Sequence, residues 1–188
     1  MLKRVAKVVA ERLFGPYQLN RIYMRELEQV AAAPPARYDI RPISSAEQFA
    51  AAIDQRMREH AWYAGENAPG FGLWENERLV CTCMFWNHKR FSDSSPIRVG
   101  EREAVLVDVI TAQESRGKGY APALIGFAEA ALKRAGFVRL YAWVWHSNHP
   151  SRRAFEKAGW KYVAFVVQTT PLGWGKPVRF EKRIHSRT

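Results

Sequence analysis

The sequence predicts a mixed α/β fold in which helices flank a central sheet of about six to seven strands. Segments with strand composition alternate with helical segments through the second half of the chain, a pattern typical of α/β domains. The 188 residues, 47% of them hydrophobic, suffice for one domain with its own core. Two cysteines exclude a disulfide scaffold, and no apolar run is long enough to span a membrane.

Residues 1–35 predict an N-terminal helical extension ahead of a domain over residues 36–188. Residues 2–14 form a basic amphipathic pattern, with charged side chains on one face and apolar ones on the other: Leu2, Val5, Val9 and Leu13. A second helical pattern runs through Leu19, Ile22, Tyr23, Leu27 and Val30, and the Ala-Pro-rich residues 31–35 resemble a linker. The first helix fits packing on the domain, a homodimer contact, or contact with an anionic membrane surface.

The domain begins with strands expected at 38–43, 70–75, 78–86 and 102–111. Ser45 and Gln48 have capping-box spacing, which predicts a helix that continues to about His60. The strands at 70–75 and 78–86 form a predicted hairpin around residues 75–77. Residues 89–100 read as a polar loop.

A long helix follows at about 119–135, with Gly136 at its C-terminal cap position. A strand at 137–145 and a short helix at 150–158 come next. Strands at about 160–170 and 177–184, joined by a turn at 173–175, close the chain.

The chain carries a formal net charge of +11, which predicts attraction to anions. Much of the excess lies near the two ends, and no recognition-helix or RNP-like motif is present, so we expect no specific nucleic-acid partner. The N-terminus lacks the unbroken apolar core of a signal peptide. The sequence therefore predicts a cytoplasmic protein, with peripheral contact at the inner membrane face through residues 2–14 as an alternative.

A glycine-rich loop, Arg116-Gly117-Lys118-Gly119, lies between a buried strand and the long helix. The first amides of a helix have no partner within the helix, and its dipole favours an anion there. Glycines permit close approach of the backbone, and the two cations add charge. An exposed turn is the alternative. The Gly-x4-Gly-Lys-Ser/Thr spacing of a P-loop is absent, and a dinucleotide fingerprint would need glycine at residue 122, which is proline.

The loop, together with the later segment from Asn148 to Trp160, resembles the GNAT acyl-CoA N-acyltransferase superfamily. The family motif Gln/Arg-x-x-Gly-x-Gly/Ala reads Glu114-Ser-Arg-Gly-Lys-Gly119 here, and the similarity spans about residues 104–162. The resemblance implies a mixed, mostly antiparallel sheet splayed around a coenzyme A cleft. It also implies acetyl-CoA, or another acyl-CoA, as cosubstrate without a metal.

The resemblance assigns the coenzyme to two parts of the chain. Backbone groups of Val109 and Thr111 would pair with the pantetheine arm, and the start of the helix would hold the pyrophosphate: Arg116, Gly117, Lys118, Gly119, Tyr120 and Ala121. Asn148, Ser151 and Arg152 would contact the coenzyme after the next strand. The alternative for Asn148 is a helix cap, and both roles are compatible.

Acyl transfer to an amine requires a neutral amine, a polarised carbonyl and a stabilised thiolate. Asp108, in an otherwise apolar strand, is the first candidate for the base or amine anchor. Glu103 is the second, and His146 and His149 are candidates for bases that act through water. Pairing with a core arginine, or capping of a backbone amide, is the structural alternative for Asp108. Phe155 stands where many family members carry a tyrosine that acts as the general acid. A phenyl ring cannot donate a proton, so the general acid stays unassigned.

Two aromatic and basic segments, residues 56–71 and 86–100, correspond to the acceptor-binding region of the family. Their composition favours a sugar or an anionic group over a polyamine. The expected function is therefore N-acetylation of a primary amine on a small molecule, such as an amino sugar. A protein, peptide or lipid-linked acceptor, or a silent coenzyme-binding module, are the alternatives. His146 and His149 lack a third metal ligand, and Cys81 and Cys83 are expected to pack in the core.

Overall fold

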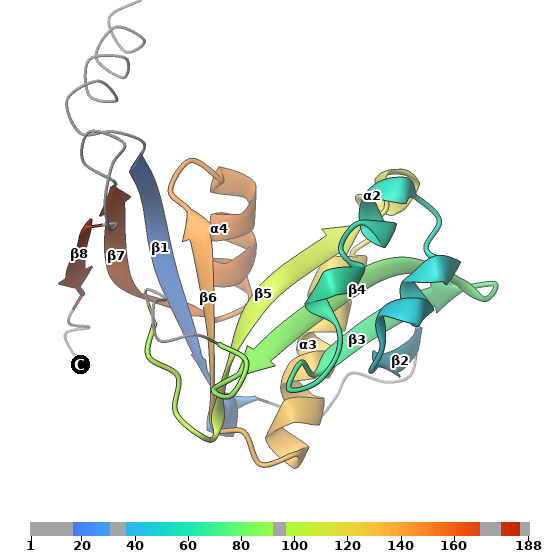
Figure 1. The fold of residues 1–188 in the computed structure, drawn as a ribbon, viewed down its shortest axis with the longest axis horizontal. Coiled ribbons are helices and arrows are strands. Elements are labelled where there is room, and N and C mark those ends of the chain that lie inside the picture. Colours follow the sequence, from blue (N-terminus) through green and yellow to red (C-terminus); the bar gives the residue numbers. More distant parts are fainter. Residues whose placement is uncertain (1–16, 31–36, 92–96, 170–177, 185–188) are drawn as a thin grey trace, which may run out of the picture. The chain divides into compact units, whose positions relative to one another are not determined.

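The computed structural model describes residues 17–30, 37–91, 97–169 and 178–184. Their strands form one sheet in the order β2-β3-β4-β5-β6-β1-β7-β8. The chain divides into two compact units: Arg25–Ala142 form one, and the described residues before and after this range form the other. The mixed, mostly antiparallel sheet flanked by helices confirms the predicted fold class (Figure 1).

In the unit Arg25–Ala142, the strands β2 (Asp39–Ile43), β3 (Gly70–Glu75), β4 (Arg78–Asn87) and β5 (Glu103–Thr111) pair antiparallel in sequence order. Asn76 and Glu77 connect β3 to β4, and both have positive φ, 51° and 59°. Two central residues in this conformation match the right-handed twist of the flanking strands. The predicted hairpin is therefore confirmed.

The strands β3 and β4 are buried along almost their whole length, because both faces of the sheet are covered. The helix α3 (Tyr120–Arg134) lies against one face, where the Phe127 ring meets Phe71 edge-on at 5.7 Å (Figure 1). The other face is covered by short helical segments, whose Phe49 and Met57 join a core with Leu79, Met84 and others.

The helix predicted from Ser45 to about His60 is wrong as one element. The structure has a 3₁₀ helix η2 (Ala46–Ala51), one α-helical turn α2 (Gln55–Arg58) and a 3₁₀ turn η3 (Ala61–Tyr63). The capping-box start is present, since Gln48 Oε1 accepts from the Ser45 amide at 3.1 Å. The break has a tertiary cause, because the Ile53 amide donates to the Leu79 carbonyl at 3.2 Å. Because the Ile53 amide is bonded to β4, it cannot make the next hydrogen bond of the helix.

The second N-terminal helix predicted from the sequence, whose residues fall in both units, is also wrong. Residues Tyr17–Glu26 form strand β1, followed by a 3₁₀ turn η1 (Leu27–Gln29), and β1 pairs antiparallel with β7 (Lys161–Thr169). The register shifts between Ile22 and Tyr23, which buries two consecutive side chains. Because of this bulge, the apolar residues of the segment have the spacing of a helix. With β1 included, the described sheet has eight strands instead of the expected six to seven.

The remaining elements follow the sequence closely. The strand β6 (Arg139–Trp145) precedes α4 (His149–Lys157), and β8 (Val178–Arg183) pairs with β7. No helix among the described ranges has the length and hydropathy needed to cross a bilayer. The expected helix 2–14, the linker 31–35 and the turn 173–175 lie outside the described residues.

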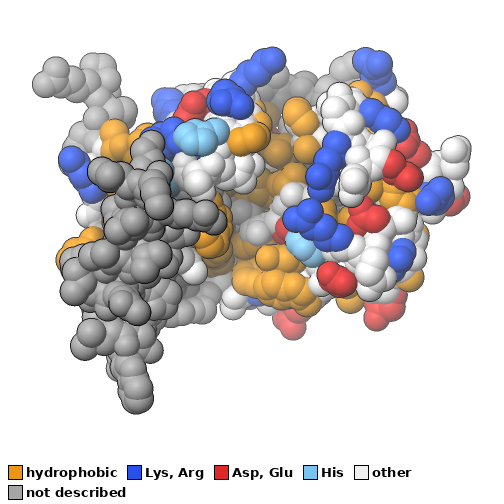
Figure 2. Space-filling model, turned by 90° about the horizontal axis from the view of Figure 1, so that it is seen from above, with side chains coloured by type: hydrophobic (Ala, Val, Ile, Leu, Met, Phe, Trp, Pro, Cys, Tyr) orange, Lys and Arg blue, Asp and Glu red, His pale blue; other side chains and the backbone are white. Residues whose placement is uncertain are grey.

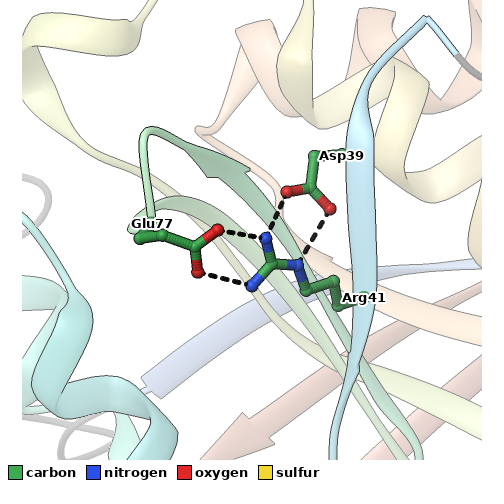
Figure 3. A network of polar contacts seen from close by, with 3 residues as sticks. All are labelled: Asp39, Arg41 and Glu77. Carbon is green, nitrogen blue, oxygen red and sulfur yellow. Dashed lines mark hydrogen bonds and ion pairs between the residues drawn. The ribbon is translucent and has the colours of Figure 1, made fainter.

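Basic and acidic side chains are interspersed over the surface seen in Figure 2, with hydrophobic side chains between them. The densest charged contact joins β2 to the β3–β4 turn (Figure 3). Arg41 donates to both oxygens of Asp39, at 2.9 and 2.6 Å, and to both oxygens of Glu77, at 2.7 and 2.6 Å. The guanidinium also lies 5.3 Å from the centre of the Trp74 ring. These paired contacts raise the pKa of Arg41 and lower that of Glu77.

Candidate active site

One edge of β5 is open over its second half. The parallel ladder between β5 and β6 pairs Glu103–Leu106 with Arg139–Ala142 and ends there. The Ala112 amide donates to the Val80 carbonyl at 2.9 Å, so the alternation of an antiparallel ladder turns Ile110 toward β4 as well. Val109 and Thr111 therefore direct their N–H and C=O groups away from β4. No strand in the described ranges continues the ladder there.

The glycine-rich loop leads from this edge into α3. Gly117 and Gly119 have φ of 79° and 80°, a left-handed conformation that favours glycine, and Gly119 is the N-cap of α3. A Cβ at either position would meet no described atom within 4 Å. Arg116 is exposed, and its Nε donates to the Thr111 carbonyl at 3.4 Å. Open amides, an N-terminal dipole and adjacent cations are the chemistry that a pyrophosphate requires.

Glu75, at the end of β3, organises the same helix start. Its Oε1 accepts a hydrogen bond from the Tyr120 hydroxyl, and its Oε2 lies 3.8 Å from Lys118 Nζ. The hydrogen bond to the carboxylate raises the pKa of Tyr120 to about 12. The Tyr120 hydroxyl is thus committed to Glu75, while Ala121 occupies the second position of the helix.

The predicted carboxylate Asp108 lies beside the open edge, on β5. Its Oδ1 is 3.0 Å from Nδ1 of His60, which lies between α2 and η3. The Asp108 side chain is only 9% exposed, and its Oδ2 is buried with no hydrogen-bond partner among the described residues. Burial raises the pKa of Asp108, while the charges of His60 and Arg56 act in the opposite direction.

A group of stacked aromatic side chains lies next to His60. The Trp62 ring is 58% exposed and stacks on Tyr63, with ring centres 3.9 Å apart, and Trp86 lies edge-on to Trp62 at 5.6 Å. Tyr63 in turn lies 5.6 Å from the imidazole of His60. We call Trp62, Tyr63 and Trp86 the aromatic shelf.

The shelf is held in place by the backbone of residues 62–66. Arg90 donates to the carbonyls of Trp62, Ala64 and Glu66 at 2.7, 3.0 and 3.2 Å, and its guanidinium covers the Trp86 ring. Arg90, a basic residue of the predicted acceptor segment 86–100, therefore makes structural contacts.

Glu103, the second predicted acid, is engaged in structural contacts as well. Its Oε1 accepts from Arg139 at 2.8 Å, and its Oε2 accepts from the Gly100 amide at 2.8 Å. Arg139 also binds Glu26 at 2.7 Å. Among the described residues these bonds occupy both carboxylate oxygens of Glu103, whereas Asp108 retains an unpaired one.

The other predicted site residues belong to the second compact unit. Asn148 caps α4 by accepting from the Ser151 amide at 3.2 Å, which is the structural alternative for this residue. Arg152 donates to the His146 carbonyl at 2.9 Å and lies 3.3 Å from His149, and its Nε is buried without a described partner. Desolvation and the nearby cationic groups lower the pKa of His146.

Phe155, at the position where the family often has tyrosine, stacks on Tyr23 of β1 at 5.7 Å. The Tyr23 hydroxyl is fully buried and donates to Glu156 at 2.7 Å. Burial and this carboxylate raise its pKa. The hydroxyl of Tyr23 therefore belongs to a ring that stacks on Phe155. Tyr23 lies on β1, the segment for which the sequence predicted a helix.

Sequence reasoning placed His60 in the acceptor segment without linking it to Asp108. The two are 48 positions apart, and only the break in the helix after Ala51 brings His60 to β5. Glu75 was also missed as the residue that holds Tyr120. The position of Glu75 at the end of β3, next to the hairpin turn, was the only sequence feature that could have pointed to this contact. The described residues hold no group of three His, Cys, Asp or Glu side chains arranged for a metal ion.

Comparison with known proteins gives a family-level match. The model of the acetyltransferase (GNAT) family matches residues 37–160. A GNAT-family protein from Novosphingobium aromaticivorans aligns at TM-score 0.62 and 17% identity, over 82% of this chain and 64% of its own. An acetyltransferase of the family from Colwellia psychrerythraea aligns at 0.56 and 19%, over 88% and 60%.

The ribosomal-protein-S18-alanine N-acetyltransferase of Escherichia coli aligns at TM-score 0.52 and 18% identity, over 73% of this chain and 95% of its own. Identities this low establish a shared fold. The chain spans about three fifths of the first two structures cited. The sequence search of curated proteins gives no match.

Proposed function

Because the chain belongs to the acetyltransferase (GNAT) family, we propose that it transfers the acyl group of acetyl-CoA, or of another acyl-CoA, to a primary amine of a small molecule. The observation that carries this proposal is the open edge of β5 beside a buried carboxylate. Val109 and Thr111 direct their backbone N–H and C=O groups to that edge, and Asp108 directly precedes Val109 on the same strand.

The described geometry fits an acyl-CoA. The arm of the coenzyme contains amides, which can pair with the backbone groups that Val109 and Thr111 direct to the open edge. The pyrophosphate fits the first amides of α3, at residues 117–121, where the left-handed glycines leave the backbone open. Arg116 and Lys118 supply positive charge there. In this proposal Asn148, Ser151 and Arg152 remain additional coenzyme contacts.

Asp108 serves the amine end of the reaction. An acceptor amine arrives as an ammonium ion, and a carboxylate in a buried position attracts it strongly. Glu103 and His146 are weaker candidates for the same task, since Glu103 is paired with Arg139 and Nδ1 of His146 accepts a hydrogen bond from Arg21 at 3.4 Å. The thioester supplies the acyl group, and its thiolate leaves readily because thiols are fairly acidic, with pKa values near 8.5.

The aromatic shelf supports an acceptor with a flat apolar face, such as an amino sugar. Exposed aromatic faces bind such surfaces and also attract nearby cations. Trp62 presents the most exposed ring of the shelf. A peptide acceptor is the alternative, and a panel that contains glucosamine and a short peptide distinguishes the two.

The first test is thermal unfolding with acetyl-CoA, free CoA and longer acyl-CoAs. A ligand at about 100 times its Kd stabilises the folded state by roughly 2.7 kcal/mol, which raises the Tm by about 5–11 °C at this size. Arg116→Glu should abolish most of the shift. Arg134→Glu, the same charge change at the far end of α3, should retain it. Absence of a shift with every coenzyme would refute the proposal.

Asp108→Asn tests the amine end separately. We expect a loss of turnover of at least tenfold with coenzyme binding unchanged, because the variant removes charge beside the acceptor and not beside the phosphates. Release of thiol from acetyl-CoA measures turnover, and the thermal shift measures binding. Turnover equal to that of the parent would remove Asp108 from the mechanism.

A further inference from the structure

His60 and Asp108 form an oriented pair. Nδ1 of His60 lies 3.0 Å from Oδ1 of Asp108, and the carboxylate is almost fully buried while the imidazole is partly exposed. A buried acid thus holds one nitrogen of the ring, and the ring itself reaches the surface beside the aromatic shelf.

The contact decides which ring nitrogen carries the proton when the imidazole is neutral. An ionised carboxylate can only accept a hydrogen bond, so Nδ1 carries the proton in the neutral imidazole. Nε2 is then left with a free lone pair. Within the described ranges, no polar side chain or backbone group makes a hydrogen bond to Nε2. The position of the hydrogen bond therefore selects the nitrogen that can accept a proton.

We propose that Nε2 of His60 accepts the proton of the acceptor amine, and that Asp108 is the positioning residue that orients the ring. The inference rests on the proposed function and changes the assignment of the base within it. Asp108 is poorly placed to accept the proton itself, because its Oδ1 is engaged by His60 and its Oδ2 is enclosed.

The groups that face the pair agree with this division of labour. Arg56 contributes positive charge that favours the ionised form of Asp108. The Tyr63 ring lies against the imidazole at 5.6 Å. Burial, and after it the charge of Asp108, raises the pKa of the Tyr63 hydroxyl, which keeps that hydroxyl neutral. Among His60, Asp108 and the described side chains around them, His60 is the one with a free basic atom.

The proton balance of the step is complete. Nε2 takes one proton from the ammonium ion, and the neutral nitrogen forms a bond to the thioester carbonyl carbon. The carbon–sulfur bond breaks, and the second amine proton leaves with the sulfur as free thiol. The imidazolium then returns its proton to solvent. No oxidant, reductant or metal is required.

The decisive variant is His60→Asn, whose amide nitrogen can replace Nδ1 as the donor to Asp108 but offers no base at the position of Nε2. We expect kcat to fall by about 10²–10⁴-fold, while KM for acetyl-CoA and the coenzyme thermal shift stay at wild-type values. Glu59→Gln, at the adjacent exposed position, is the matched control. Thiol release with glucosamine, and with benzylamine as second acceptor, provides the assay.

Chemical rescue separates a base from a structural residue. Added imidazole should restore part of the turnover of His60→Ala and leave Asp108→Asn unchanged. A His60→Asn variant that turns over at the parental rate would overturn the inference. A parent that binds acetyl-CoA but acetylates neither amine would count against the proposed acceptor class instead.

A second measurement decides the inference without turnover. The ¹⁵N chemical shifts of the neutral His60 ring in the free protein should place its proton on Nδ1. Asp108→Asn should weaken that preference. A proton on Nε2 in the parent would refute the assignment, even if the protein proves to be an active acyltransferase.

Discussion

At the scale of single residues, the contact between Tyr120 and Glu75 links the first residue of α3 to the end of β3. Two side chains from different elements meet there, so their coupling is measurable. Glu75 is partly exposed, with 40% of its side chain in contact with solvent, which limits the contact to about 1 kcal/mol of stability.

We expect the double-mutant cycle of Tyr120→Phe and Glu75→Gln to give a coupling free energy of about 1 kcal/mol in urea unfolding near pH 7. The Tyr120 hydroxyl keeps its proton to a pKa of about 12 in the folded chain and to about 10 when unfolded. The contribution is therefore complete below pH 10 and disappears as the pH rises through 12. Additive single mutants would show that the contact contributes nothing.

At the scale of elements, α3 and its N-cap hold two glycines with opposite requirements. Gly119 is the N-cap with a φ of 80°, whereas Gly126 lies in the middle of the helix. A Cβ meets no described atom within 4 Å at either position. Sterics with neighbours therefore play no part, and backbone conformation alone decides the effect of alanine.

Gly119→Ala should destabilise the protein by about 1 kcal/mol, and Gly126→Ala should stabilise it by about 0.5–1 kcal/mol. Denaturant unfolding of both variants measures the pair, with each serving as control for the other. Equal effects of the same sign would contradict the assigned conformation of the helix start.

The sequence predicted elements well where local signals and packing agreed. The hairpin at Asn76 and the end of α3 at Gly136 are such cases. It failed at β1, because the bulge after Ile22 buries adjacent side chains and breaks the alternation that marks a strand. It failed again after Ala51, where the bond from Ile53 to Leu79 ends the helix. Both causes are pairings between distant segments.

The candidate site shows the same division. Asp108 and the glycine loop were predictable, since an acid in an apolar strand and glycines before a helix are local signals. The partner of Asp108 was not, because His60 reaches β5 only through the interrupted helical segment. Whether Asn148 and Arg152 contact the coenzyme stays a prediction, and Asn148 at least has the cap of α4 as a sufficient reason to be there.

At the scale of the whole molecule, the net charge of +11 should govern how fast an anionic coenzyme associates. Surface charges act over about 30 Å at 0.01 M salt and about 8 Å at 0.15 M. We expect the association rate of acetyl-CoA to fall by about tenfold between these conditions, as measured by stopped-flow. The dissociation rate should change much less. A rate independent of salt would mean that the charge plays no part in steering.

The end of the β5–β6 ladder at Leu106 also has a consequence for hydrogen exchange. Amides in the interior of a sheet normally exchange slowly, because a neighbouring strand holds them. On β5 the amide of Ile110 is held by β4, whereas those of Val109 and Thr111 point to the open side. The strand should therefore contain protected and unprotected amides in alternation. Its open positions would exchange like a surface loop until a ligand completes the ladder.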